Sequence, residues 1–268
     1  MIFFISMQRN NFCTRHSFTL STFKKSIMKR LFRNLAIAFF LSVGIISNAC
    51  TTSLSSEIGQ ELRNLKDFTG ISLSISADVY LTQGNEYSVN IEADKDILDK
   101  IETEVEGGIL KISTVRGFSI GWNNAKIKIH VTMPEIQKLS IAGSGDIKAV
   151  TSITANNLST SISGSGDISI PDLSVKTLTA NISGSGDINI LGKGTAKDAS
   201  IKVTGSGDIT LKGIEFKDGE VTITGSGNAY LVVTENLNAR VVGSGDIVYS
   251  GNPLIDAKVT GSGRIQGK

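Results

Sequence analysis

Apolar and polar residues alternate with a period of two along most of the chain after residue 65. In one segment the apolar or small residues are all even-numbered: Leu178, Ala180, Ile182, Gly184, Gly186, Ile188 and Ile190. Strict alternation predicts an extended strand with one buried face. The parity does not change across Gly-Ser-Gly. The two glycines are therefore expected to point inward, or to lie at a bend where a Cβ would not fit, while Ser and Asp point outward.

A Gly-Ser-Gly motif occurs seven times after residue 140, at steps of 21, 20, 21, 20, 18 and 18 residues. The next residue is Asp in five copies, Asn228 in the fifth copy along the chain and Arg264 in the seventh. Because one copy cannot bury its own inner face, stacked copies must form a continuous core, as in a solenoid. The period is too short for a four-stranded propeller blade, which needs roughly 40 residues.

We therefore predict an all-β fold, a right-handed parallel β-helix (β-solenoid) with about seven Gly-Ser-Gly-Asp coils. An antiparallel barrel or sandwich, with one hairpin per repeat, is the main alternative. Residues 141–268 are predicted to form the repeat solenoid. Residues 65–140 alternate as strands without the motif and are predicted as an irregular N-terminal β region that caps it. Turn residues between the motifs, such as Pro171 and Asp172, are expected to line one edge.

The beginning of the chain is predicted to be a leader and not part of the fold. Residues 1–27 are interpreted as an over-called N-terminus, because Met28 directly precedes a basic segment. Residues 28–49 then follow the order of a signal peptide: basic residues, an uncharged run and small residues. That run is shorter than the roughly 20 apolar residues that cross a membrane. Cys50 follows the small residues and is predicted to be lipidated, with residues 50–64 as a tether.

Cleavage after Ala49 without lipidation would leave a soluble protein and is the alternative. If the lipoprotein prediction holds, the mature chain has no thiol for a disulfide, a zinc site or a nucleophile. The leader holds seven of the 27 basic residues and none of the 25 acidic ones, so the mature chain has 20 against 25, a net charge of about −5. A mildly acidic chain is not expected to bind nucleic acid. We expect an outer-membrane lipoprotein of the cell envelope, facing either the periplasm or the surface.

The outward Ser and Asp of the repeats form the candidate binding face. Its residues are Ser144, Asp146, Ser165, Asp167, Ser185, Asp187, Ser206, Asp208, Ser244 and Asp246. A regular array of hydroxyls and carboxylates suits a glycan or an envelope protein as partner; the alternative is a solvated face. For the Asp column, one hypothesis is a Ca²⁺ ladder. The other, which we favour, is that each Asp accepts hydrogen bonds from the amides of its own turn, with no cofactor.

Trp122 is the candidate aromatic contact, since it could stack on a sugar; the alternative is a residue packed in the cap. No catalytic or metal site is predicted. Beyond the leader there is one histidine, His130, and no Ser-His-Asp set can be assembled around it. The Gly-rich segments lack the Lys-Ser/Thr and the helix of a phosphate loop.

Several segments resemble those of a known family. They are Phe68-Thr69-Gly70-Ile71, residues 79–84, residues 89–94, Val131-Thr132-Met133-Pro134 and residues 139–147. Together they are similar to the putative auto-transporter adhesin, head GIN domain family, a domain of unknown function. The resemblance covers roughly residues 65–250. It implies a β-helical fold in a secreted or lipid-anchored envelope protein, and it carries over no catalytic residue.

From these patterns we expect a non-catalytic envelope lipoprotein that serves as a binding or adhesion-type β-helix module. One alternative is a structural scaffold that self-associates as a homo-oligomer through the solenoid ends. The other is an enzyme acting on polysaccharide. That enzyme would need an acidic cluster outside the repeat pattern, which the sequence does not show.

Overall fold

The computed structural model describes residues 57–117 and 126–268. The predicted leader, the lipidation site Cys50 and Trp122 lie outside these residues, so the structure does not test them. Within the described ranges, no helix has the length and apolar character needed to cross a membrane.

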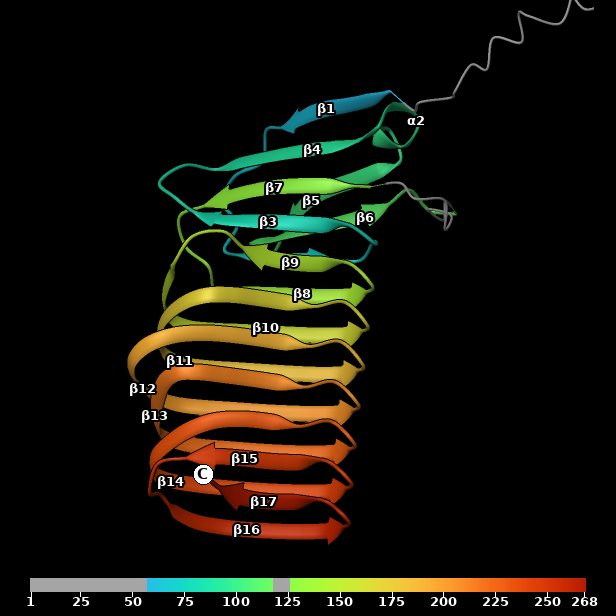
Figure 1. Ribbon diagram of the computed structural model, residues 1–268. Helices are drawn as coiled ribbons and strands as arrows, with labels where there is room; N and C mark the ends of the chain where they lie inside the picture. Colours follow the sequence, from blue (N-terminus) through green and yellow to red (C-terminus); the bar gives the residue numbers. More distant parts are fainter. Residues whose placement is uncertain (1–56, 118–125) are drawn as a thin grey trace, which may run out of the picture. The chain divides into compact units, whose positions relative to one another are not determined.

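The repeats form strands that stack in parallel, each coil pairing with the next (Figure 1). The strands are β8 (Lys138–Gly143), β9 (Asp146–Ala149), β10 (Ile153–Gly164), β11 (Ile168–Gly184), β12 (Ile188–Gly205), β13 (Ile209–Gly225), β14 (Ala229–Gly243), β15 (Asp246–Ser250), β16 (Leu254–Gly261) and β17 (Arg264–Gly267). All pairings among them are parallel. The predicted parallel β-solenoid is therefore confirmed, and the alternative of antiparallel hairpins is wrong.

Equivalent positions of successive coils lie directly over one another. Ile162 pairs with Ile182, which pairs with Val203, and the column continues through Ile223 and Val241. Each of these side chains is at most 2% exposed. The odd-even alternation of the sequence therefore becomes a set of apolar columns inside the solenoid, and their burial supplies the main stabilising free energy, roughly 25 cal/mol per Å².

The connectors between the motifs form two corners of the coil and not the single edge that we expected. Pro171 and Asp172 are both exposed and make one bend, after which the buried Leu173 returns to the core. The second bend comes at Thr177 and at its stacked equivalents in the later coils. At each bend two adjacent residues point outward, so the alternation of buried and exposed residues is interrupted. The segment between the two bends forms a short additional side of the coil.

The 18-residue step arises where β14 stacks on β13. From Thr210 to Glu215 β13 advances five residues, whereas β14 advances two, from Tyr230 to Val232. Beyond Phe216 the difference is reduced by one residue, because β13 advances two residues to Asp218 while β14 advances three, from Val233 to Asn236. The shortest coils therefore lose two residues at this face, and the register of the core is kept.

The N-terminal region has a different strand order. Its elements are β1 (Ile58–Arg63), β2 (Gly70–Leu73), β3 (Asp78–Gln83), β4 (Ser88–Asp94), α2 (Lys95–Leu98), β5 (Ile101–Glu106), β6 (Ile109–Thr114) and β7 (Lys128–Met133). β2 pairs in parallel with β6 and β8, and β3 pairs with β7 and β9. The coil formed first in the sequence, β2–β3, therefore lies between the later coils β6–β7 and β8–β9.

Antiparallel strands then cover the coil β6–β7. β4 pairs with β7, β1 pairs with β4, and β5 pairs with β6. β1 lies inside the range predicted as a tether, and that range needs correction. The chain is paired from Ile58 onward, and Arg63 donates a hydrogen bond to the carbonyl oxygen of Ile101 at 3.3 Å. The outer edge of β5 carries Glu102, Glu104 and Glu106, all exposed.

Candidate functional site

Each repeat turns sharply at its Gly-Ser-Gly-Asp segment, which we call the GSGD corner. The first glycine of every corner has a φ between 121° and 146°, a region that favours glycine. From the second corner onward, a Cβ added to either glycine would overlap the carbonyl oxygen of the equivalent glycine one coil earlier, far inside the 3.0 Å that real Cβ atoms keep. The sequence prediction that a Cβ would not fit is correct, and the obstacle is the neighbouring backbone.

The Asp residues of the corners form a continuous hydrogen-bonded column, which we call the carboxylate ladder. The backbone N–H of each member donates to the side-chain Oδ1 of the member one coil earlier. The donor-to-acceptor distances are 3.1 Å for Asp167 to Asp146, 2.8 Å for Asp187 to Asp167, 2.8 Å for Asp208 to Asp187, 2.7 Å for Asn228 to Asp208 and 3.0 Å for Asp246 to Asn228. The favoured prediction, that each Asp bonds its own turn, is wrong: the amide belongs to the next coil.

Asn228 occupies a ladder position because the interaction needs one acceptor oxygen and not a charge. Its Oδ1 accepts the N–H of Asp246, and its Nδ2 donates to Asp208 Oδ1 at 2.9 Å. The substitution also removes one negative charge from a column in which neighbouring carboxylates repel.

A cationic side chain stands at each end of the ladder. Lys148 Nζ lies 2.9 Å from Asp78 Oδ1 and 3.0 Å from Asp146 Oδ2. The hydrogen bonds that Lys148 donates to these two carboxylates, first the one to Asp78, raise the pKa of Lys148. At the other end, Arg264 donates its backbone N–H to Asp246 Oδ1 and its guanidinium NH2 to Oδ2, at 2.9 Å and 2.6 Å. The Arg264 side chain lowers the pKa of Asp246.

These contacts bear directly on the predicted binding face. The serines Ser144, Ser165, Ser185, Ser206 and Ser244 are exposed, as predicted from their outward parity. Each interior ladder carboxylate, in contrast, has one oxygen committed to an amide of the next coil. No group of three or more His, Cys, Asp or Glu side chains that could hold a metal ion exists among residues 57–117 and 126–268.

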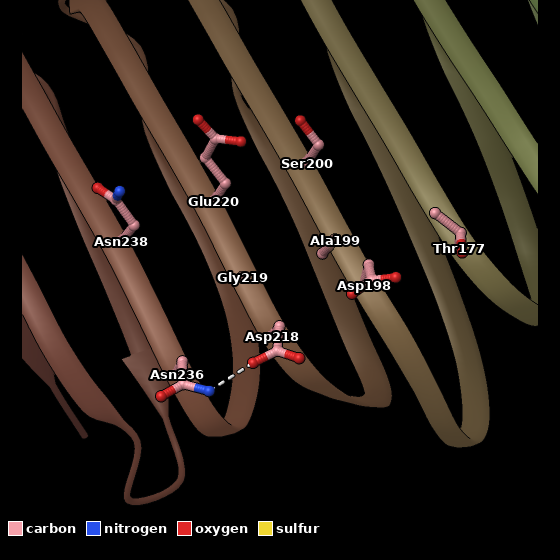
Figure 2. A pocket seen from close by; sticks show the side chains of 9 residues that line it. All are labelled: Thr177, Asp198, Ala199, Ser200, Asp218, Gly219, Glu220, Asn236 and Asn238. Atoms are coloured by element: carbon pink, nitrogen blue, oxygen red, sulfur yellow. Dashed lines mark hydrogen bonds between the residues drawn. The ribbon is translucent and has the colours of Figure 1, made fainter.

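A shallow groove of about 460 Å³ lies on another side of the coils and was not found from the sequence (Figure 2). We call it the polar groove; it is lined by Thr177, Asp198, Ala199, Ser200, Asp218, Gly219, Glu220, Asn236 and Asn238. The strands β11 to β14 contribute these residues in two stacked rows. One row follows the register Thr177, Asp198, Asp218 and Asn236, and the other contains Ser200, Glu220 and Asn238.

Chemically, the polar groove offers acidic, amide and hydroxyl groups on a small-residue floor. Ala199 and Gly219 lie between the rows and are buried. Asn236 Nδ2 donates to Asp218 Oδ1 at 2.7 Å, and Lys197 Nζ lies 3.3 Å from Asp198 Oδ2. Glu220, Ser200 and Asn238 are exposed. Period-two parity does indicate that these residues point outward, but only the coil register shows that they share one groove.

Two comparisons, with a family model and with solved structures, place the chain among known proteins. A sequence model of the putative auto-transporter adhesin, head GIN domain family matches residues 67–253. A solved structure named a putative adhesin from Bacteroides fragilis is 26% identical, with a TM-score of 0.73 over 80% of this chain and 98% of that one. A protein named a putative lipid binding protein from Parabacteroides distasonis is 27% identical, with a TM-score of 0.65 over the same shares of both chains. No curated protein matches.

The stacked GSGD corners and these matches define an adhesin-like β-solenoid. The chain belongs to the putative auto-transporter adhesin, head GIN domain family, as its sequence motifs predicted. The family and the structural neighbours are described as adhesins or binding proteins and not as enzymes. An adhesin-like family suggests a location at the bacterial envelope or surface.

Proposed function

We propose that the protein is a non-catalytic binding module of the bacterial envelope and that the polar groove recognises a hydroxyl-rich ligand, a glycan. The observation that carries the proposal is the groove itself, in which four consecutive coils present carboxylates, amides and hydroxyls in two parallel rows (Figure 2). Carboxylate and amide oxygens accept hydrogen bonds from hydroxyls, and amide nitrogens donate them.

The groove suits this role better than the predicted face of Ser and Asp. The ladder carboxylates have a structural partner in the next coil, for example Asp187 with the N–H of Asp208. Glu220 and Asn238 are exposed and have no such bond, so they are available to a ligand. The Ser and Asp face, including Ser185 and Asp187, remains the second candidate surface for a glycan or an envelope protein.

Glycan-array binding of the purified protein tests the proposal. We expect saturable binding that Glu220→Gln and Asn238→Ala weaken at least tenfold, since both remove groove contacts. Glu215→Gln is the matched control, because Glu215 is an exposed carboxylate on the same strand, outside the groove. If only Asp187→Asn lost binding, the result would show that the Ser and Asp face, and not the polar groove, binds the glycan.

A second arm of the experiment uses vesicles of anionic and neutral lipids, because one relative is named as lipid binding. Binding to vesicles but to no glycan would overturn the glycan proposal. Chelator is included in both arms. If it abolished binding, Ca²⁺ would become part of the site.

We also propose that the protein is attached to the outer membrane by lipid at Cys50. The support is the order of a basic segment, an uncharged segment and small residues before this cysteine. Metabolic labelling with a fatty acid should mark the protein, and Cys50→Ala should abolish the label. A labelled Cys50→Ala protein, or an unlabelled native one, would contradict the proposal.

A further inference from the structure

The last coil ends in β16 and β17, each of which leaves one edge uncovered within the described chain, and β16 is the longer of the two. β16 pairs in parallel with β14 on one side, and no other described strand pairs with it. All eight of its residues are exposed, including Leu254 at 78%, Ile255 at 42% and Val259 at 42%. Ile255 and Val259 continue core columns, because they stack on the buried Leu237 and Val241.

The backbone of β16 also has unpaired groups on a known side. In β10, Ser159 donates its N–H to the carbonyl oxygen of Gln137 in the previous coil. Ser165, an odd-numbered residue like Ser159, donates in the same direction to Gly143 at the corner. Ser262 is the equivalent corner residue, and it donates to Gly243. Even-numbered residues of β16 therefore face β14. The N–H and C=O groups of Ile255, Ala257 and Val259 point to the open edge.

The sequence of this edge is complementary to itself. In an antiparallel pair of two β16 strands centred on Ala257, Asp256 lies opposite Lys258 of the second copy, and Lys258 lies opposite its Asp256. Ile255 lies opposite Val259 in the same way. The odd-numbered residues, whose backbone groups are free, fall at the hydrogen-bonded positions. The two ion pairs fall at the non-hydrogen-bonded positions, where side chains are closest.

We propose that two copies of this chain associate tail to tail through antiparallel pairing of β16, forming a twofold-symmetric dimer. A twofold axis through Ala257, perpendicular to the sheet, keeps the inward faces on the same side. The apolar columns that end at Ile255 and Val259 then continue into the second copy. Such an interface is isologous and closes after two subunits. This proposal does not depend on the polar groove or its ligand.

Charge reversal provides the main test, by sedimentation velocity of the purified protein over a concentration series. The native protein should form dimers and no larger species. Lys258→Asp places like charges opposite each other, and it should weaken dimerisation at least tenfold. Asp256→Lys should do the same. The double variant Asp256→Lys with Lys258→Asp restores both pairs in exchanged positions and should dimerise as the native protein does.

Ala257→Pro is a second variant, since it removes the central N–H that points to the open edge and leaves the bonds to β14 in place. It should be monomeric and keep the native circular dichroism spectrum. A native protein that is monomeric at every concentration would overturn the proposal. So would dimers that survive Lys258→Asp, or open-ended oligomers, which indicate pairing of β16 with the N-terminal end of another copy.

Discussion

The corner of the coil β2–β3 occupies the same place in the stack as the GSGD corners, with different residues and a different backbone conformation. Asp78 stacks on Asp146, so Ile75 and Ala77 occupy the places of the two glycines, Gly143 and Gly145. A Cβ on Gly145 would overlap the carbonyl oxygen of Ile75. Ile75 and Ala77 can carry side chains because Ile75 lacks the positive φ of the first corner glycines and because no GSGD corner precedes them in the stack. Glycine in the repeats is thus required both by the φ of the first position and by the backbone of the coil before it.

The edge strands β5 and β16, at opposite ends of the solenoid, differ in how they are protected. At the N-terminal end β1 and β5 each leave one edge uncovered, and the three exposed glutamates of β5 would repel an identical edge. The edge of β16 carries one acid, Asp256, and one base, Lys258. A single charge sign excludes self-pairing, whereas two opposite charges around a centre favour it in one register.

The largest expected effect comes from testing the glycine columns. Gly186→Ala forces a Cβ into the backbone of Gly166 and should lower the free energy of unfolding by about 3 kcal/mol. The matched control is the reverse change at the equivalent place in the N-terminal region, Ala77→Gly, which should cost about 1 kcal/mol. Denaturant titration measures both. Equal costs would show that the corners do not differ in the way described.

Removing a ladder carboxylate should have an intermediate effect. Asp187→Ala leaves the N–H of Asp208 without its acceptor and should cost about 1 kcal/mol. Asp187→Asn keeps the acceptor oxygen, as Asn228 does, and should change stability by less than about 0.5 kcal/mol. Asp78→Ala removes only a half-exposed ion pair with Lys148 and should cost no more than about 0.5 kcal/mol. An Asp187→Asn protein as unstable as Asp187→Ala would contradict the acceptor role.

The smallest effect concerns pH at the C-terminal end of the ladder. Arg264 lowers the pKa of Asp246 in the folded protein. The ion pair therefore contributes its full stability above the pKa that Asp246 has in the unfolded chain, and the contribution is lost as the pH falls through the folded-state pKa of Asp246. Arg264→Gln should therefore be less stable than the native protein at neutral pH, and the two should converge in acid. Unfolding titrations at several pH values measure this difference. A constant difference down to strongly acidic pH would contradict it.

Local patterns predicted the repeat region well for a physical reason. The alternation of apolar and polar residues specifies which side chains face inward, and the repeat period specifies which residues stack in successive coils. The inward position of Ile182 and the outward position of Ser185 both follow from one copy of the motif. What one copy does not contain is the contact between coils. The acceptor of the Asp208 amide and the sharing of one groove by Asp198 and Asn238 therefore required the structure.

The N-terminal region was less predictable because its contacts are distant in sequence. Nothing in residues 65–140 indicates that β2–β3 is inserted between two later coils. Gln83 shows the consequence for a single side chain. Its Nε2 donates to the carbonyl oxygens of Pro134 and Thr154, both at 3.0 Å, and its Oε1 accepts the N–H of Thr154 at 2.7 Å. It joins segments 51 and 71 residues away, and no local pattern marks it.

The insertion of β2–β3 between later coils also has a consequence for folding kinetics. Repeat coils contact neighbours about 20 residues away, so each can add to a finished edge with a small loss of chain entropy. The pair formed by Asp78 and Lys148 instead closes a loop of 70 residues. Topologies rich in such distant contacts fold slowly. We expect assembly of the N-terminal coils to be the rate-limiting step of folding. The repeat coils then add one after another to the edge formed by β8 and β9.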